Sequence, residues 1–348
     1  MSELVTIETQ QHEIAIRNAE RLQAAAEVAD AQSRQNTFVE YNSLKSDATL
    51  RTYRAGLRLF AEFLNEHIGT ELNGDLLQTD PQAWRHISFG LIDAFKQWML
   101  QNGYSVSSIN NRLSAVRVYA KLAASAGMIG HLESLEIGDV RGYADKEAQR
   151  IDERREVTRI GLKKETHTRI RETDLETFRQ PMDERDRAIR DAFIRCIMID
   201  MGLRVGEVVR LTVEGVDMAR GMIVFFRPKV HTTQTHNLPR SVRLALEAYL
   251  PLAPKAGRLI CGSKRNGKLN HNRGMSESNI ALMVKQSGLR LGYDHLSPHD
   301  FRHSWATRAA RNGTDLFVLQ EAGGWNSLVM PRRYVEKQKI ANMGIKLE

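Results

Sequence analysis

The chain has 348 residues, with 50 Lys or Arg against 42 Asp or Glu and a formal net charge of +8. This length allows two domains with separate cores, and two cysteines, Cys196 and Cys261, are too few for a disulfide scaffold and are expected to be reduced. No apolar run approaches the roughly 20 residues that span a bilayer and no signal peptide is evident, so we expect a cytoplasmic protein, and its positive charge favours an anionic partner.

Residues 1–42 differ from the rest of the chain in charge. They contain three Arg against seven Asp or Glu, a net charge of −4, so the remaining residues, 43–348, carry 8 + 4 = +12. Their Ala-, Glu- and Gln-rich sequence has a partly helical pattern at 14–31. We interpret this segment as an N-terminal extension, either a frayed helix or one that binds a partner, and not as a DNA-binding arm.

Residues 43–131 predict a small all-helical domain. Apolar residues recur at helical spacing in a segment that starts at Asp47, in 90–102, and in a segment that starts at Ser107 or Ser108. The first and third segments also carry basic and polar stripes, formed by Arg51, Arg54, Arg58, Asn111, Arg112, Arg117 and Lys121. A single stripe of this kind is usually a solvated face, but two in one domain favour contact with DNA.

A charge-rich segment, 132–160, predicts a linker, and 161–348 predicts a second domain. A long apolar-faced helix is expected at 188–201 and a short one after Arg204. Two strands, 222–226 and 235–239, flank a loop that contains Lys229. Helices follow at 241–250 and 276–289. The whole chain is therefore predicted to be mainly α with a small β-sheet, an all-α domain followed by an α+β domain.

Four side chains typical of a phosphate site gather between positions 296 and 334. Ser297 and Pro298 read as the N-cap and first residue of a helix, so His299 and Arg302 share one face of its opening turns. Trp325 follows Gly323 and Gly324 on a turn, and Tyr334 comes nine residues later. A tyrosine hydroxyl with a pKa of about 10 needs cationic neighbours or a base to act as a nucleophile.

The sequence MGLRVGEVVRL around Arg204, the strand-borne Lys229, the motif HDFRH, the motif GGW and the following Tyr334 resemble the tyrosine recombinase (phage integrase) family. The resemblance covers roughly residues 43–340. It implies that the helical domain is a core-binding domain and that the second domain is catalytic. Most members have His where this chain has Trp325, but Cre-like recombinases have Trp there.

The resemblance implies a role for each matched residue. Tyr334 would attack DNA and form a 3′-phosphotyrosyl bond, while Arg204 and Arg302 hold the non-bridging oxygens of the scissile phosphate. Lys229 would protonate the departing 5′ oxygen. These assignments fit the chemistry, because bidentate Arg neutralises equatorial phosphate oxygens and Lys is a flexible proton donor.

Three further residues would assist. His299 would help proton transfer at Tyr334 or at the phosphate, Glu207 would orient the site around Arg204, and the indole N–H of Trp325 can still donate a hydrogen bond. Taken singly, each of these residues is more often an ordinary surface or core residue. Their joint order and spacing are what favour the catalytic interpretation.

The family resemblance predicts double-stranded DNA with inverted-repeat sites as the partner, a tetramer on two sites, and no cofactor, metal or membrane. The alternatives are relaxation of DNA by a type IB topoisomerase, a DNA-binding protein that has lost catalysis, and a zinc-dependent hydrolase. The last would use His299 and His303 of HDFRH, four apart as in H-E-x-x-H, but Arg302 between them disfavours a cation and no third ligand is evident.

Overall fold

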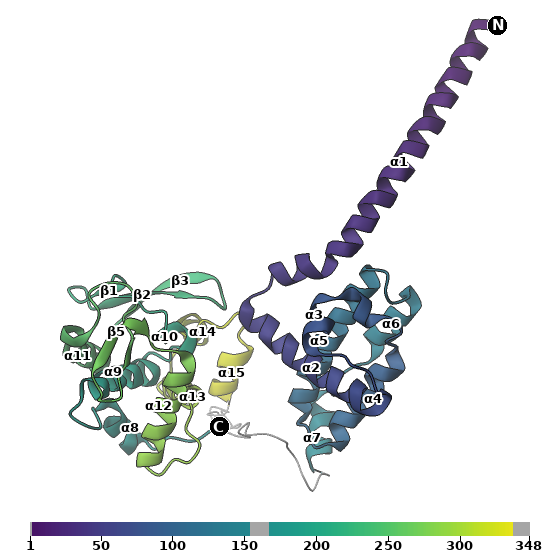
Figure 1. The fold of residues 1–348 in the computed structure, drawn as a ribbon. Coiled ribbons are helices and arrows are strands. Elements are labelled where there is room, and N and C mark those ends of the chain that lie inside the picture. Colours follow the sequence, from purple (N-terminus) through teal and green to yellow (C-terminus); the bar gives the residue numbers. More distant parts are fainter. Residues whose placement is uncertain (1, 154–166, 337–348) are drawn as a thin grey trace, which may run out of the picture. The chain divides into compact units, whose positions relative to one another are not determined.

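The computed structural model describes residues 2–153 and 167–336. The chain forms two compact units, Met1–Leu162 and Lys163–Glu348 (Figure 1). Each unit has its own hydrophobic core. The first unit is helical in all its described elements, and the second combines helices with two small sheets. This confirms the predicted fold class. No helix in the described ranges is long and apolar enough to cross a membrane.

In its described residues, 2–153, the first unit has seven α-helices and one short 3-10 helix, Pro81–Trp84. The α-helices are α1 (Ser2–Ser43), α2 (Asp47–Ile68), α3 (Gly74–Thr79), α4 (Phe89–Gln101), α5 (Val106–Ser125), α6 (His131–Asp139) and α7 (Asp145–Glu153).

Helices α2 and α5 pack closely and form the centre of the first unit. The side chain of Ser46 caps α2 by accepting a hydrogen bond from the Thr49 amide, and α2 stops at Gly69, which has a positive φ of 78°. A β-carbon added at Gly56 of α2 would lie 3.0 Å from that of Ala115 on α5. Glycine therefore allows the two helices to approach each other.

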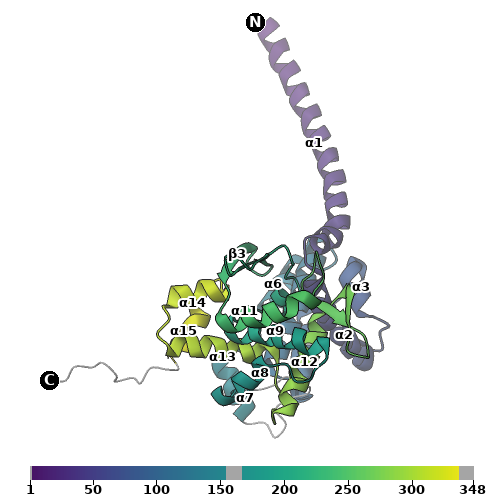
Figure 2. The same cartoon turned by 90° about the vertical axis from the view of Figure 1, so that its left-hand side faces the viewer.

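Helix α1 is longer than the sequence pattern predicts, and its end belongs to the core of the first unit. Residues 16–36 are exposed, and Figure 2 shows the helix from a second side. Phe38, only 1% exposed, packs against Tyr119 with ring centroids 5.5 Å apart. The Tyr119 hydroxyl donates a hydrogen bond to the side-chain oxygen of Asn42. The last turns of the predicted extension are thus anchored by α5.

Helix α6 lies where the sequence predicts a linker. Ile137 and Val140 are 2% and 6% exposed and pack in the core of the first unit. The sequence did not indicate this helix, because two buried apolar residues in 132–140 are too few to establish a helical periodicity. Helix α7 also falls within the predicted linker, and 154–160 lie outside the described residues.

The second unit contains eight α-helices, two antiparallel sheets and a 3-10 helix, Leu250–Leu252, within its described residues. The helices are α8 (Glu172–Arg179), α9 (Asp186–Asp200), α10 (Val205–Val208), α11 (Arg240–Tyr249), α12 (Glu277–Arg290), α13 (Pro298–Arg311), α14 (Leu316–Gly323) and α15 (Val329–Glu336). The strands are β1 (Val216–Asp217), β2 (Met222–Arg227), β3 (Thr232–Asn237), β4 (Cys261–Ser263) and β5 (Leu269–Gly274).

The hairpin of β2 and β3 places Lys229 in an exposed turn, as predicted. The pairing runs from Met222 opposite Asn237 to Arg227 opposite Thr232, so 228–231 connect the strands. Strand β1 pairs on the other side of β2, and β4 and β5 form a separate hairpin. Side chains of β2 alternate between buried and exposed, with Arg227 on the buried side.

Helix α13 begins as the sequence predicts. Ser297 is its N-cap in a capping box with Asp300, and Pro298 occupies the first turn. Helix α14 is capped by Asp315 and ends at Gly324, which has a positive φ of 59°. Helix α15, which carries Tyr334, was not predicted from the sequence.

Candidate active site

Helix α10 presents Arg204 and Glu207 as one unit. Arg204 is the N-cap of α10. The Glu207 carboxylate accepts hydrogen bonds from the Arg204 backbone amide at 2.8 Å and from Arg204 Nη1 at 2.9 Å. Arg204 Nη2 donates to the Gly324 carbonyl at 2.8 Å, which joins α10 to the turn before Trp325. Glu207 is only 2% exposed, whereas the Arg204 side chain is 23% exposed. A buried carboxylate thus orients a partly accessible guanidinium.

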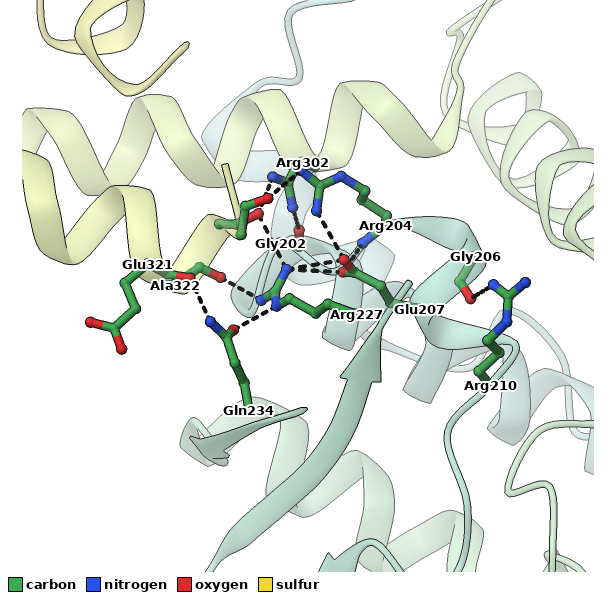
Figure 3. A network of polar contacts seen from close by, with 12 residues as sticks. Gly202, Arg204, Gly206, Glu207, Arg210, Arg227, Gln234, Arg302, Glu321 and Ala322 are labelled. Carbon is green, nitrogen blue, oxygen red and sulfur yellow. Dashed lines mark hydrogen bonds and ion pairs between the residues drawn. The ribbon is translucent and has the colours of Figure 1, made fainter. Parts of the chain in front are cut away.

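Arg227 at the end of β2 is a member of this cluster that sequence reasoning missed. It is fully buried, and its Nη1 donates to both Glu207 oxygens at 3.1 and 3.2 Å (Figure 3). Its Nε donates to Gln234 Oε1 on β3, and its Nη2 donates to the Ala322 carbonyl, both at 2.6 Å. The sequence did contain a signal for Arg227. Arg227 lies two residues after Phe225 and four after Ile223, so it faces the same buried side of the strand.

Arg302 of α13 lies beside this network and above an indole. Its Nη1 donates to the Gly202 carbonyl at 2.6 Å, and its Nη2 donates to the Gly323 carbonyl. Its guanidinium carbon is 4.4 Å from the ring centroid of Trp325, a cation–π distance. Burial lowers the pKa of Arg302 to about 9, with a further contribution from the Arg204 charge, which still leaves it cationic at neutral pH.

The glycine turn between α14 and α15 serves all three arginines. The carbonyls of Gly323 and Gly324 accept hydrogen bonds from Arg227, Arg302 and Arg204. A β-carbon at Gly324 would lie 2.7 Å from Arg227 Nη1, and its positive φ also disfavours other residues. The GGW motif is therefore required by backbone conformation and by close contact, in addition to any role of Trp325.

The cluster carries an excess of positive charge. Arg204, Arg227 and Arg302 contribute three positive charges, and Glu207 contributes one negative charge between Arg204 and Arg227 (Figure 3). Guanidinium groups that are already oriented by hydrogen bonds suit the oxygens of a phosphodiester, which carry negative charge. The arrangement can therefore stabilise charge on a phosphate without a metal ion.

Tyr334 of α15 closes one side of the site. Its ring centroid lies 5.9 Å from that of Trp325, and its hydroxyl is 2.7 Å from Nδ1 of His303 on α13. The side chain is 6% exposed, and burial raises the pKa of its hydroxyl to about 12, although Arg302 acts in the opposite direction. The phenol is therefore neutral at physiological pH. The sequence did not indicate that His303 would contact this hydroxyl.

Among the described residues, His299 and Lys229 make no hydrogen bond to the three arginines. His299 is exposed one turn before His303, with their ring centroids 4.5 Å apart. Partial desolvation lowers the pKa of His299, and the charges of His167 and Arg302 lower it further. Lys229 lies in the exposed hairpin turn two residues beyond Arg227, whose side chain fastens the end of β2 to the cluster. The structure thus brings together most of the predicted catalytic residues through direct contacts, whereas Lys229 is linked to them through Arg227 on the same hairpin.

The zinc interpretation of HDFRH lacks a ligand set. His303 contacts the Tyr334 hydroxyl and stacks on His167. Within residues 2–153 and 167–336, no group of three or more His, Cys, Asp or Glu is arranged to hold a metal ion. The pair at 299 and 303 therefore has no structural support as a metal centre in that part of the chain.

In the first unit, three of the predicted DNA-contact residues line one groove. Arg51 of α2 and Asn111 and Arg112 of α5 border a cavity of about 430 Å³ between the two helices. Arg54 and Arg58 instead form ion pairs on the surface, at 2.7 Å with Asp75 and 3.4 Å with Glu62. Arg117 donates to the Gly138 carbonyl, and Lys121 is exposed.

Two family models match the chain. Residues 168–340 match the phage integrase family, and residues 36–127 match the phage integrase N-terminal SAM-like domain. Together the matches span about three quarters of the sequence.

Curated relatives with similar sequences are tyrosine recombinases. The chain is 33% identical to XerC of Pseudomonas aeruginosa over 153 residues, 42% of this chain and 47% of that protein. The aligned segment thus spans about half the length of this relative. XerC of Roseiflexus castenholzii is 26% identical over 289 residues, 82% of each protein, and XerA of Thermococcus kodakarensis is 26% identical over 84% of this chain and 86% of its own.

Solved structures share the fold. XerH recombinase bound to palindromic difH DNA superposes with a TM-score of 0.59 at 17% identity, covering 83% of this chain and 76% of that one. A lambda integrase dimer bound to a core site superposes with a TM-score of 0.57 at 13% identity, covering 87% and 96%.

Proposed function

Because the chain belongs to the phage integrase family, we propose that it is a site-specific DNA recombinase that cleaves and rejoins DNA through a covalent 3′-phosphotyrosyl intermediate. The observation that carries this proposal is the meeting of Tyr334, Trp325 and Arg302 beside the Arg204–Glu207 pair. A nucleophile and two oriented guanidinium groups are the components that phosphoryl transfer requires.

In the cleavage step, the Tyr334 oxygen attacks the scissile phosphorus and its proton passes to a nearby base. The bond from phosphorus to the 5′ oxygen breaks, and Lys229 donates a proton to that oxygen. Arg204 and Arg302 neutralise charge on the non-bridging oxygens. Rejoining reverses these steps, with the 5′ hydroxyl as nucleophile and Tyr334 as the leaving group. The covalent intermediate keeps the energy of the phosphodiester bond, so ATP is not needed.

Phosphate binding must rearrange part of the described site. Arg302 and Tyr334 are only 2% and 6% exposed, and the carbonyls of Gly202 and Gly323 each accept a hydrogen bond from one terminal nitrogen of Arg302. A phosphate oxygen can therefore reach these two side chains only when a segment that covers them moves. A shift of the turn at Gly323 and Gly324 would achieve this, because that turn also carries the acceptor of Arg204.

Trp325 takes the position where most family members have His. Cre-like recombinases also have Trp at this position. In this role the indole supports the Arg302 guanidinium by a cation–π contact. Glu207 orients Arg204 through a hydrogen bond. His299 lies three residues before Arg302, whose charge contributes to lowering the His299 pKa, and it assists at the phosphate. No second titratable acid or base is needed at position 325.

The proposed substrate is double-stranded DNA with inverted-repeat sites, bound by residues 43–131 and 161–348 together. The solved structures of XerH and lambda integrase are complexes with a difH substrate and a core site. From the family resemblance we also propose that the protein assembles as a tetramer on two DNA sites. Such a protein acts in the cytoplasm, where its DNA is. In the first unit, the groove lined by Arg51, Asn111 and Arg112 is the surface that we assign to the DNA backbone.

The test uses a nicked suicide substrate taken from the inverted repeats nearest the encoding gene, in buffer with EDTA. The wild-type chain should form a covalent adduct, and Tyr334→Phe should bind the DNA with similar affinity and form none, because only the attacking oxygen is removed. Failure of the wild type to form an adduct, or an adduct from Tyr334→Phe, contradicts the proposal. Relaxation of plasmids without such sites would instead identify a type IB topoisomerase.

A further inference from the structure

His303 is the residue that contacts the proposed nucleophile. Helices α13 and α15 bring its Nδ1 to 2.7 Å from the Tyr334 hydroxyl. The phenol holds its proton at neutral pH, because burial raises the pKa of Tyr334. Attack on phosphorus therefore requires a group that removes this proton, and a neutral imidazole at hydrogen-bond distance is suited to do so.

We propose that His303 accepts the Tyr334 proton during cleavage and returns it during rejoining. This inference rests on the proposed function and adds a catalytic residue to it. As the bond from Tyr334 Oη to phosphorus forms, the O–H bond breaks and its proton moves to His303 Nδ1, which gives an imidazolium. For Nδ1 to accept, the neutral ring must carry its proton on Nε2.

The surroundings of His303 allow this role. The ring is stacked on His167 and meets His299 edge to face, so its orientation is held from two sides. His303 and Tyr334 also line a cavity of about 710 Å³, bordered by Arg169, Arg308 and Arg311 among others. A cavity of this size admits water, which can exchange protons with the imidazole between cleavage and rejoining.

The same geometry separates the two histidines of HDFRH. His299 lies one turn earlier on α13, three residues before Arg302, and its ring contacts those of His167 and His303. His303 lies one turn further along, against Tyr334. We therefore assign His299 to the phosphate and His303 to the nucleophile, whereas the sequence suggested that His299 serves either one.

The experiment changes the acidity of the nucleophile. Tyr334 is replaced by a fluorinated tyrosine of lower phenol pKa, by codon suppression in the full chain, in wild-type, His303→Gln, His299→Gln and Lys229→Ala backgrounds. With ordinary tyrosine, His303→Gln should slow adduct formation on the suicide substrate by about 100-fold, the usual scale for general base catalysis. Fluorination should restore most of that rate, because a more acidic phenol needs less help to lose its proton.

The matched controls decide the assignment. His299→Gln and Lys229→Ala should not be rescued by fluorination, since neither removes the phenol proton. An unchanged rate in His303→Gln, or equal rescue of all three variants, overturns the role of His303. Thermal unfolding is measured for each variant, and rates and DNA affinities are then compared at a temperature where all variants are folded. If the wild type forms no adduct, the proposed function itself fails, which is a different result.

Discussion

Two arginines of the second unit's cluster, Arg227 and Arg302, and two on α2 of the first unit, Arg54 and Arg58, are held in opposite ways. Arg227 and Arg302 are 0% and 2% exposed, and each is fastened by hydrogen bonds to side chains or carbonyls from several elements. Arg54 and Arg58 have side chains 54% and 72% exposed, with one surface ion pair each. The same residue type is thus oriented in one region and solvated in the other.

The difference separates two uses of positive charge. An oriented guanidinium in a buried site acts on one phosphate at short range, where little salt screening occurs. An exposed guanidinium attracts the whole DNA backbone and is screened over about 8–10 Å. We therefore expect substitutions in the cluster to change the rate of cleavage, and substitutions on α2 and α5 to change affinity and its salt dependence.

Arg204→Ala should show the largest effect. It removes a charge that Glu207 orients beside the phosphate, and loss of an arginine from a phosphoryl-transfer site typically costs about 10³-fold or more. DNA affinity should fall much less than the rate. The measurement is single-turnover adduct formation with saturating enzyme. An equal loss of affinity and rate would mean that Arg204 acts as a general DNA contact, and the comparison would fail.

Lys229 is exposed like the arginines of the first unit, yet we expect it to act on the chemistry. Lys229→Ala should slow cleavage by about 100-fold, because the 5′ alkoxide is a poor leaving group without a proton donor. A substrate with sulfur at the 5′ bridging position should restore most of the rate, since a thiol with a pKa of about 8.5 leaves readily. Arg204→Ala should stay slow on the same substrate. Rescue of both variants, or of neither, means that Lys229 is not the acid.

Arg227→Met tests whether the buried network positions the cluster. Removing one partner of a buried ion pair costs about 3–5 kcal/mol of stability, and misplacing Arg204 through Glu207 should slow adduct formation by about 10- to 100-fold. The matched control is Arg195→Met on α9. Arg195 is equally buried, and its partners are the Phe178 and Gln180 carbonyls and Ser287. Similar destabilisation without a slower rate is expected there, and equal slowing in both would reduce Arg227 to a folding role.

Local signals predicted many of the helices and much of the hairpin. Nearby residues indicate the Ser297–Pro298 start of α13, the turn at Gly323 and Gly324, and the strands around Lys229. Helix α15 was missed because Val329–Glu336 is short and places Pro331 inside its first turns. Local pattern is sufficient where caps and periodicity coincide, and insufficient for short helices held by tertiary contacts.

The contacts inside the site could not be predicted in the same way. Arg227 meets Glu207 across 20 positions and the Ala322 carbonyl across 95, and Tyr334 meets His303 across 31. No sequence period links such residues. Their partners are set by how α10, α13 and the glycine turn pack. Arg204, Arg302 and Tyr334 were therefore recognisable from the sequence, whereas Arg227 and these three pairings were not.

The smallest expected effects concern the groove of the first unit. Arg51 and Arg112 line the cavity between α2 and α5, and each should neutralise about one DNA phosphate. The logarithm of the DNA association constant should fall linearly with the logarithm of the salt concentration. Each substitution to Ala should make this negative slope shallower by about 0.9.

Arg58→Ala is the matched control for that slope, because Arg58 lies on the same helix as Arg51 but pairs with Glu62. Each of the two substitutions removes one positive charge from α2, so the net charge changes equally and the location of the charge differs. We expect a change in slope well below 0.9 for Arg58→Ala, with cleavage rates at saturating enzyme unaffected in all three variants. If Arg58→Ala flattens the slope as much as Arg51→Ala, charge alone governs binding and the groove has no special place in it. If Arg51→Ala slows cleavage at saturation, the exposed arginines of the first unit also act on the chemistry, and the division between oriented and solvated charge does not hold.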